Sequence, residues 1–518
     1  MEKKYYFAFP VCLSFLLLFA IDCPILKEQK PDWANAGVRG GIPEYPASIH
    51  DVTYYGAKGD GQTDDTQAIL TAMNACPDRH AVIFPAGTYL IIDSLNITRP
   101  IVLRGDSPTT TRINSQHEWA AINVNSDWAG VEDMHVHTDW QWEGIQGEKI
   151  VFNQAKDSWV KNIETTGYTY YHILINGGTH CEIRDSYIHN NEEDMNIPEF
   201  SSYGVSILDG DASYHLVENN IFDWFRHNMN IEEFYGSDPK QNVFGYNFCW
   251  YTYTFTGSLF SATTTLEFHH NSVFYNLAEG NVVEQVGFQS NGHHYNTIFR
   301  NRITNGGVSA GDSNYIIGNE LTEIKNPGSS MAGFGGNNIR GYYGEYIIYG
   351  NWITDTADPG LDFPIPNNSL PSSKYLTSRP DWFGDLDWPC YGSDLMPGNT
   401  RRSPAEVRYW TIKFPETNIP HIVNSGLQGD EVKLEWTFTP TYNGPVDYII
   451  CRSVDGNNYK RIGETYDTEY TDTLAEPGTY HYYIRARNHE GGKNHNGDVN
   501  GLDLGGESEP SNVILIPY

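Results

Sequence analysis

The sequence predicts an all-β protein: a right-handed parallel β-helix, a single-stranded solenoid with an N-terminal helical cap, followed by a C-terminal β-sandwich. Three observations carry this prediction: a strand–turn–helix motif at 51–89, a degenerate repeat over 130–355, and period-two strands after 422. The composition agrees, because 49 Gly and 35 Tyr with only 19% charged residues are typical of a turn-rich β-protein.

The N-terminus has the pattern of an export signal. Lys3 and Lys4 precede an apolar run from Tyr5 to Ile21. We therefore expect residues 1–22 to be a signal peptide and the protein to be secreted, periplasmic or at the cell surface. Cys23 leaves lipid attachment open as an alternative. No other apolar run is long enough to span a bilayer, so the sequence predicts no integral membrane protein.

The charge balance bears on the partners. The chain has 33 basic and 65 acidic residues, a formal charge of −32. Nucleic acid is therefore excluded as a partner, because phosphate binding needs a positive surface. A polyanionic substrate would need a local basic cleft or bound cations. We expect a monomer.

The cysteines predict no covalent framework. Seven of them are scattered along the chain without a CxxC pair. Buried, inert thiols are favoured over disulfides or a zinc site.

The first motif, residues 51–69 followed by 82–89, reads as a strand, a Gly/Asp turn and a helix. Thr63, Asp64 or Asp65 can cap that helix, which would cover the open end of a solenoid. The motif resembles the N-terminal cap of the pectate-lyase, rhamnogalacturonase and epimerase-like superfamily of parallel β-helices. The resemblance implies the fold, a β-helix domain over 48–414 with its cap at 48–90, and a polysaccharide substrate. Lyases, hydrolases, epimerases and phage tailspikes share this cap, so the reaction stays open.

The repeat consists of a short apolar strand, a Gly/Asn/Asp/Ser turn, a second strand and a polar residue. Stacked coils of this kind bury their apolar faces against one another. We expect the terminal polar residues to stack at one corner and to bond to backbone, and thus to be structural. They are Asn162, Ser186, Asn220, Asn247, Asn271, Asn301, Asn319 and Asn351.

The C-terminal third has two parts. Residues 355–414 are rich in Pro and Trp and are interpreted as an irregular wrap that closes the C-terminal end of the helix. Residues 418–518 contain alternating strands, such as Val432–Trp436 and Tyr480–Ala486, and resemble a fibronectin type III sandwich. We expect this domain to be a spacer, with sugar binding as the alternative.

Side chains that follow successive corners should stack on one face. Arg226 and His227 are the first candidate reacting centre: Arg226 would neutralise a uronate carboxylate and His227 would be the base. Tyr251 or Tyr253 would be the acid. The alternatives are an ordinary aromatic exterior and a surface pair with Glu232 or Glu233. The accompanying substrate-binding candidates are Tyr168, His189, Trp224 and Trp250.

A second candidate cluster lies further along the chain. His293 and Arg300 are catalytic candidates there, and Glu279 and Arg302 are substrate-binding candidates. The alternative is that His293 belongs to an ordinary turn between strands.

One acidic run raises the question of a metal. Glu192, Glu193 and Asp194 offer oxygen ligands of the kind Ca²⁺ prefers, so Ca²⁺ is a possible cofactor. A solvated loop is the alternative, since adjacent side chains alternate in direction.

The leading functional hypothesis is a polysaccharide lyase that cleaves a uronate-containing glycan by β-elimination. A glycoside hydrolase with paired carboxylates is the nearest alternative. A non-catalytic glycan-binding or adhesin solenoid is the third. The hallmark motifs of polygalacturonases are not assembled in this chain. The available carboxylates are Asp209, Asp211, Glu232, Glu233, Glu279, Glu284 and Asp312.

Overall fold

The structure is a computed structural model that describes most of the chain after residue 30. The described ranges are 31–138, 147–167, 169–190, 202–208, 211–233, 239–252, 264–270, 273–288, 293–310, 314–321, 340–341, 347–349, 352–353, 370–395, 401–413, 417–441, 446–488 and 506–518. The predicted signal peptide and Cys23 lie outside them.

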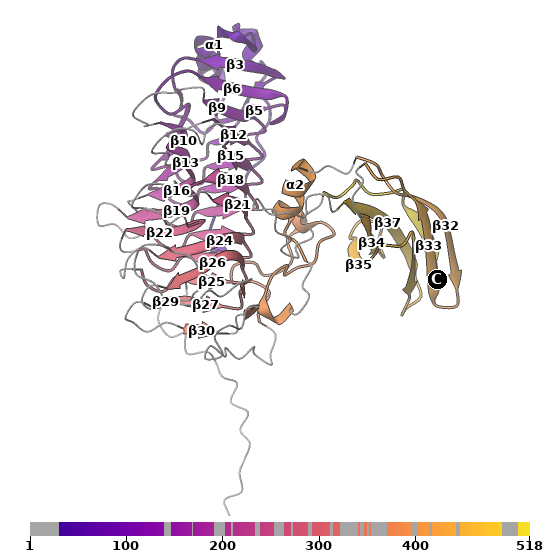
Figure 1. The fold of residues 1–518 in the computed structure, drawn as a ribbon. Helices are drawn as coiled ribbons and strands as arrows, with labels where there is room; N and C mark the ends of the chain where they lie inside the picture. Colours follow the sequence, from indigo (N-terminus) through magenta and orange to yellow (C-terminus); the bar gives the residue numbers. More distant parts are fainter. Residues whose placement is uncertain are drawn as a thin grey trace, which may run out of the picture.

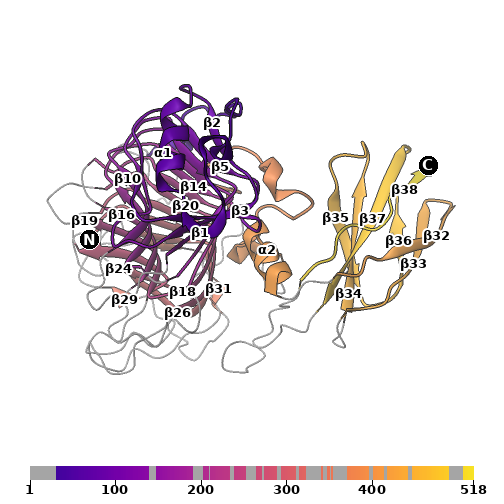
Figure 2. The same cartoon turned by 90° about the horizontal axis from the view of Figure 1, so that it is seen from above.

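A parallel β-helix and a smaller β-sandwich make up the molecule, with the sandwich beside the solenoid (Figure 1). The view from above shows helix α2 (Pro404–Lys413) between the two bodies (Figure 2). The predicted fold class is confirmed for both.

Three series of parallel strands form the solenoid. The strands of sheet 1 are β2 (Ala81–Phe84), β5 (Val102–Gly105), β8 (Gly130–Glu132), β11 (Trp159–Lys161), β14 (Glu182–Arg184), β17 (Leu216–Glu218), β20 (Val243–Gly245), β23 (Leu277–Glu279), β25 (Thr297–Phe299), β27 (Tyr315–Ile317) and β30 (Ile347–Tyr349). Those of sheet 2 are β1 (Asp60–Asp64), β3 (Gly87–Ile91), β6 (Thr111–Ser115), β9 (His135–Thr138), β12 (Glu164–Thr166), β15 (Tyr187–His189), β18 (Ile221–Phe225) and β21 (Phe248–Thr252). Those of sheet 3 are β4 (Leu95–Ile97), β7 (Ile122–Val124), β10 (Glu148–Asn153), β13 (Tyr171–Asn176), β16 (Tyr203–Leu208), β19 (His227–Glu233) and β22 (Leu266–His270).

Sheets 2 and 3 merge towards the C-terminal coils. The long strands β24 (Val282–Phe288) and β26 (Arg302–Ala310) continue both sheets. The last described strands are β28 (Glu320–Leu321), β29 (Arg340–Gly341) and β31 (Trp352–Ile353), which pair on from β26. The earlier coils therefore contribute one strand to each sheet, and the later coils contribute one long strand to sheets 2 and 3 together. The inward side chains of all coils fill a continuous apolar core.

Asparagine ladders hold two corners of the solenoid. Between sheets 1 and 2, Oδ1 of Asn247 accepts a hydrogen bond from the backbone N–H of Asn220 at 3.0 Å, and Nδ2 of Asn247 donates to Oδ1 of Asn281 at 3.0 Å. The ladder continues through Asn301 and Asn319. The structural role predicted for these corner residues is confirmed. The position assigned to Asn271 is taken by Asn281, and Asn271 and Asn351 lie outside the described residues. Asn162 instead has a left-handed backbone conformation and comes just before its corner.

The second ladder stands between sheets 3 and 1. Here Oδ1 of each asparagine accepts from the backbone N–H one coil earlier. Its members are Asn242, Asn276, Asn296 and Asn314. The connections between sheets 2 and 3 differ most in length, being short between β18 and β19 and long between β15 and β16.

The cap is formed as predicted. Helix α1 (Thr66–Ala75) lies over the first coil and buries Ile69, Ala72 and Met73 in the core. Asp65 precedes the helix, but its carboxylate accepts from the backbone N–H of Lys58 and Gly59. The short helix η3 (Val52–Tyr55) packs beside α1.

A segment before the cap runs along the outside of sheet 1. We call residues 33–47, which begin with the short helix η2 (Trp33–Asn35), the N-terminal strap. Trp33 Nε1 donates to the carbonyl of Tyr275 at 2.7 Å, and Tyr45 Oη donates to the carbonyl of Trp128. The backbone N–H of Val38 donates to Glu182 between these points. Sequence analysis did not predict this contact across many coils.

The Pro/Trp-rich wrap covers a flank of the solenoid. Its described parts, 370–395 and 401–413, contain α2 and the short helices η5 (Asp381–Phe383) and η6 (Ser393–Leu395). They pack on outward apolar side chains of sheets 1 and 2, such as Leu216, Phe248 and Phe299. Sequence analysis placed the wrap at the C-terminal end; these outward apolar side chains explain why the described part lies along the side instead.

The C-terminal body is a sandwich of two antiparallel sheets. One contains β32 (His421–Gln428), β33 (Glu431–Thr437) and β36 (Glu469–Thr473). The other contains β34 (Val446–Ser453), β35 (Lys460–Thr465), β37 (Thr479–Asn488) and β38 (Ile514–Pro517). Trp436 lies in the core between them, as expected. The closer resemblance to fibronectin type III stays a prediction.

Two further expectations concern the described residues. The five cysteines there, Cys76, Cys181, Cys249, Cys390 and Cys451, are free and buried, as predicted. No helix in the described part of the chain is both long and apolar enough to cross a membrane.

Candidate functional site

The outer face of sheet 3 carries a group of polar side chains on two neighbouring strands. In β19 and β22, Met229, Ile231, Leu266 and Phe268 point into the core. Because side chains of a strand alternate, the residues between them point outward. Asn230 pairs with Glu267 across the two strands, and Glu232 pairs with His269. We call His227, Asn230, Glu232, Glu267 and His269 the Glu/His cluster.

Glu267 is the carboxyl group with the most altered acidity in this cluster. It is 7% exposed, and burial raises its pKa to about 8. The positive charge of Arg226 opposes this shift, whereas the negative charge of Glu232 adds to it. Glu267 is therefore protonated at neutral pH.

Glu232 provides a second carboxylate one strand and two residues away. It is 2% exposed and accepts a hydrogen bond from Nδ2 of Asn230. Nδ1 of His269 lies 3.3 Å from its Oε1. Two buried carboxyl groups with different surroundings are thus held on adjacent paired strands.

His227 is buried against Glu267. Its Nδ1 lies 2.7 Å from the carbonyl of Thr264 and 3.9 Å from Oε2 of Glu267. Because a carbonyl only accepts, Nδ1 carries the proton and donates it to Thr264. Burial, with a smaller contribution from Arg226, lowers the pKa of His227 to about 3. The imidazole is therefore neutral, and it is a weak base.

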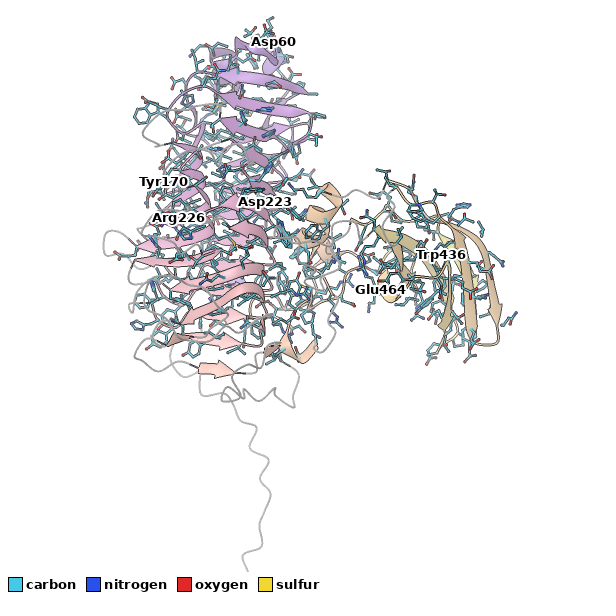
Figure 3. The ribbon with its side chains drawn as sticks, in the orientation of Figure 1. Asp60, Tyr170, Asp223, Arg226, Trp436 and Glu464 are labelled. Carbon is cyan, nitrogen blue, oxygen red and sulfur yellow. The ribbon has the colours of Figure 1, made fainter. Side chains whose placement is uncertain are left out.

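Aromatic rings line the same face on the N-terminal side of the cluster. Tyr171, Tyr203 and His227 pair in register on β13, β16 and β19. The ring centroids of Tyr203 and His227 are 5.2 Å apart, and Tyr170 lies 5.1 Å from Tyr203. Half-buried Arg226 donates to Tyr203 Oη at 3.4 Å. Figure 3 shows Tyr170 and Arg226 on the flank away from the sandwich.

Two outward polar atoms next to the carboxyl groups are buried without a hydrogen-bond partner among the described residues. They are Oγ of Ser206 and Oδ1 of Asn230, which pair in register on β16 and β19. Buried polar atoms are usually hydrogen-bonded, so these two have free capacity for a hydrogen bond on this face.

The structure brings some of the predicted site residues together here. Arg226 and His227 both lie at the Glu/His cluster, with Glu232 beside them. The alternative was that Arg226 and His227 are ordinary surface residues paired with Glu232 or Glu233. It does not fit His227, which is 2% exposed. The low pKa of His227 does not suit the base role assigned to it.

Other predicted residues lie on sheet 2. Nε2 of His189 is 2.9 Å from Glu164, and Trp250 packs against Trp410 of the wrap with ring centroids 5.0 Å apart. Trp224 lies in β18, where its carbonyl accepts from Asn190. Asp223, its neighbour on the outer face of sheet 2, points towards the wrap (Figure 3). We expected the aromatic side chains that follow successive corners to form a single face. They are instead divided between two sheets.

The second predicted cluster is occupied by structural contacts. Arg300 is 2% exposed, and its guanidinium donates to Asp394 and to carbonyl groups of the wrap. Arg302 is ion-paired with Glu320 at 2.9 Å, and its guanidinium lies over the ring of Tyr391 in the wrap at 4.4 Å. Glu279 accepts from Tyr246 and from the backbone N–H of Lys374. Arg300, Arg302 and Glu279 therefore attach the wrap.

The remaining predicted residues lie in a turn, in β21 or outside the described residues. His293 is buried, and its carbonyl accepts from the ladder residue Asn314, in accordance with a turn. Tyr251 lies in β21. The candidates Tyr168, Tyr253, Glu192, Glu193 and Asp194 lie outside the described residues.

The metal prediction is untested for that reason. Within the part of the chain that the structure describes, no group of three or more His, Cys, Asp and Glu side chains could hold a metal ion. The Ca²⁺ prediction at Glu192, Glu193 and Asp194 stays a prediction.

Sequence reasoning missed Glu267, His269 and Asn230. The signal that could have found them is strand alternation: Leu266-Glu267-Phe268-His269 and Met229-Asn230-Ile231-Glu232 place acidic, amide and imidazole groups between core residues. Apolar and ionisable residues that alternate in a strand show which ionisable side chains point outward together.

Comparison with known families agrees with the N-terminal motif. Residues 49–244 match the family model described as rhamnogalacturonase A/epimerase, pectate lyase-like. Over these residues the chain resembles that family. The match confirms the resemblance read from the cap, and it includes His227 and Glu232 but ends before Glu267.

One curated relative matches over a short stretch. It is the non-secreted LysM effector LysM19 of Penicillium expansum, 31% identical over 91 residues. The stretch is 17% of this chain and 6% of that protein, so the chain spans a small part of this relative.

Several solved structures are similar. Tailspike protein 2 of bacteriophage CBA120 matches with a TM-score of 0.40 and 10% identity over 91% of this chain and 81% of that one. An alginate lyase of Paenibacillus sp. matches with a TM-score of 0.31 and 11% identity, over 55% and 96%. An α-1,3-glucanase of Streptomyces thermodiastaticus matches with a TM-score of 0.29 and 13% identity, over 61% and 69%.

Proposed function

We propose that this protein is a polysaccharide-degrading enzyme and that the Glu/His cluster hydrolyses a glycosidic bond. The observation that carries the proposal is the pair of buried carboxyl groups on β19 and β22, one of which, Glu267, has a pKa of about 8. Glycoside hydrolysis needs one carboxylic acid that is protonated at the working pH and one carboxylate. The carbohydrate substrate is supported by the match to the rhamnogalacturonase and epimerase model.

The chemistry follows from the surroundings of each group. Glu267 donates its proton to the leaving glycosidic oxygen, because burial keeps the carboxyl group neutral until that charge develops. Glu232 supplies the second carboxylate, either to activate water or to attack the anomeric carbon. Asn230 holds Glu232 through its amide. His227 positions Glu267 and is not itself the base.

The aromatic rings extend the site along the axis. Tyr171 and Tyr203 lie on successive coils, with Tyr170 beside both, and strands of neighbouring coils are about 4.8 Å apart. Tyrosine rings suit the apolar faces of sugar rings, and their hydroxyl groups suit the polar edges. A polymer that lies parallel to the solenoid axis, and passes over Tyr203 towards Glu267, fits this order of side chains.

β-Elimination is the second candidate, and Arg226 favours it. This half-buried guanidinium beside Tyr203 could neutralise a uronate carboxylate next to the cluster. Under this alternative the base would have to be a group other than His227, whose pKa is about 3.

The deciding experiment incubates the full chain with a panel of neutral and uronate-containing polysaccharides. Reducing ends and the ultraviolet absorbance of unsaturated uronates are followed together. Hydrolysis produces reducing ends alone, elimination produces both signals, and an adhesin produces neither. Reducing ends without absorbance support the proposal, and either other result contradicts it.

A matched pair of variants tests the residues. Glu267→Gln should lower turnover roughly 100- to 10,000-fold, the range typical of a lost general acid. Glu164→Gln removes a carboxylate that also faces outward beside a histidine, but on sheet 2. It should leave turnover unchanged. If the two substitutions lower turnover equally, Glu267 is not the general acid.

A further inference from the structure

A cavity lies at the junction of the wrap and the sandwich, away from the Glu/His cluster. It has a volume of about 390 Å³. Arg379, Asp381 and Asp385 line it from the wrap, and Asn457, Tyr459 and Tyr483 line it from the sandwich. The volume lies within the range of roughly 300–1,000 Å³ that is common for small-ligand sites, at its lower end.

Contacts between the wrap and the sandwich form the wall of this junction cavity. Asp385 accepts from Tyr483 Oη at 3.0 Å, and its backbone carbonyl accepts from the N–H of Arg461. Nε of Arg485 lies 3.5 Å from Asp385, and its guanidinium lies over the ring of Tyr483 at 5.6 Å. These contacts join wrap and sandwich, so the cavity does not depend on a loose contact between the two.

Two charged side chains in the cavity have no partner within the described ranges. Arg379 and Asp381 form no hydrogen bond or ion pair there through their side chains, whereas Asp385 and Arg485 are engaged with each other. One unpaired cation and one unpaired anion therefore face the same space. Together with Arg485 and Asp385 they leave the cavity without net charge, in a chain of formal charge −32.

The apolar part of the lining is a pair of tyrosines. The ring centroids of Tyr459 and Tyr483 are 4.5 Å apart, and Tyr459 is half-buried. Asn457 lies in the exposed turn that begins at Asp455, whose carboxylate accepts from the turn's backbone N–H groups. The exposed side chain of Asn457 lies at the rim, where its Nδ2 donates to the carbonyl of Asp455 at 3.4 Å.

We propose that the junction cavity binds a neutral saccharide unit and is a second, non-catalytic glycan site. An aromatic ring supplies a surface for a sugar ring, the guanidinium donates to hydroxyl oxygens, and the carboxylate accepts from hydroxyl groups. A neutral, hydroxyl-rich ligand matches one cation and one anion better than a polyanion does. This inference goes beyond the proposed hydrolysis and does not depend on its mechanism.

The test is affinity electrophoresis of the full chain in gels that contain soluble xyloglucan, galactomannan or mixed-linkage glucan, with polygalacturonate and alginate as acidic probes. Glu267→Gln is used as the background so that the polymers stay intact. We expect retardation by at least one neutral polymer. Arg379→Ala and Tyr459→Ala should weaken it at least about tenfold, the equivalent of about 1.4 kcal/mol.

Matched controls keep the result interpretable. Arg401→Ala changes an arginine of the wrap that lines a different cavity, and Tyr466→Ala changes an exposed tyrosine of the sandwich. Both should leave retardation unchanged. Thermal unfolding shows whether each variant is folded; if Tyr459→Ala is not, Arg379→Ala decides, since that guanidinium has no partner in the described structure.

Three outcomes would overturn the inference: no retardation by any neutral polymer, retardation by acidic polymers alone, or equal retardation of the Arg379 variant and its parent. Failure of the proposed hydrolysis is recognised separately, because the protein with the native Glu267 would then release no reducing ends.

Discussion

Glu267 lies directly opposite Gly287 on the neighbouring strand, and a methyl group at position 287 would come within 2.6 Å of its Oε2. A side chain at position 287 would also press on Thr264, whose carbonyl holds His227. The absence of a side chain at 287 therefore provides the space in which the buried carboxyl group of Glu267 rests.

Gly287→Ala should displace the Glu267 carboxyl group while the strand stays paired. We expect turnover to fall at least about tenfold, because a misplaced acid loses alignment with the leaving oxygen. Steady-state kinetics on the cleaved polymer measure this. Gly426→Ala is the control, since nothing lies within 4 Å of its new methyl group. Unchanged turnover in Gly287→Ala would mean that the position of the Glu267 carboxyl group does not affect the reaction.

The raised pKa of Glu267 predicts a pH-dependent stability. The carboxyl group stays protonated in the folded protein up to about 8, whereas the unfolded chain releases that proton above about 4.5. Stability from this group is therefore complete below 4.5 and is lost as pH rises to about 8, by roughly 1.4 kcal/mol for each pH unit. Glu267→Gln should remove this trend.

Chemical denaturation of the native protein and Glu267→Gln across pH 4.5 to 8 checks the window. The free energy of unfolding of the native chain, relative to the variant, should fall steadily. A difference that does not change with pH would mean that Glu267 is ionised in the folded state.

Tyr375 is expected to anchor the wrap to sheet 1. Its hydroxyl donates to Glu218 at 2.7 Å, and burial raises the pKa of Glu218 to about 7. Tyr375→Phe leaves a buried acceptor with one donor fewer, so the free energy of unfolding should fall by about 1–3 kcal/mol. Tyr466→Phe, at an exposed position, should change it little. Turnover should stay the same in both, because neither residue touches the Glu/His cluster.

The ladder residue Asn247 should matter for stability and not for chemistry. Its side chain donates to the carbonyl of Val217 at 2.8 Å and accepts from the backbone N–H of Asn220 at 3.0 Å. Asn247→Ala leaves both backbone groups buried and unpaired, which should cost more than about 2 kcal/mol. Denaturant unfolding measures this loss against Asn125→Ala, where the side chain is exposed. Equal losses would show that the corner bonds contribute nothing.

The sequence predicted the fold because the solenoid is built from local signals. The Asp51–Ile69 motif, the corner asparagines and the alternation around Trp436 each depend on near neighbours in the chain. The path of the wrap depends instead on outward apolar residues such as Phe299, which sequence cannot distinguish from core residues.

The site was only half predictable for a related reason. Arg226 and His227 stand out in the sequence as an adjacent pair, whereas Glu267 becomes notable only when β22 is placed beside β19. Its neutral state depends on burial and on Glu232, 35 positions away in the chain, and no local pattern reports either. Arg300 and Arg302 misled because a charged pair looks the same whether it faces a ligand or the wrap.

The N-terminal strap sets an order of events during folding. Trp33 and its acceptor Tyr275 are separated by 242 positions, so the strap cannot settle until most of the coils have formed. Contacts of such long range are slow to close. The coils from the cap to Tyr275 therefore form while this outer surface of sheet 1 is still uncovered, and the first residues of the described chain are among the last to reach their final positions.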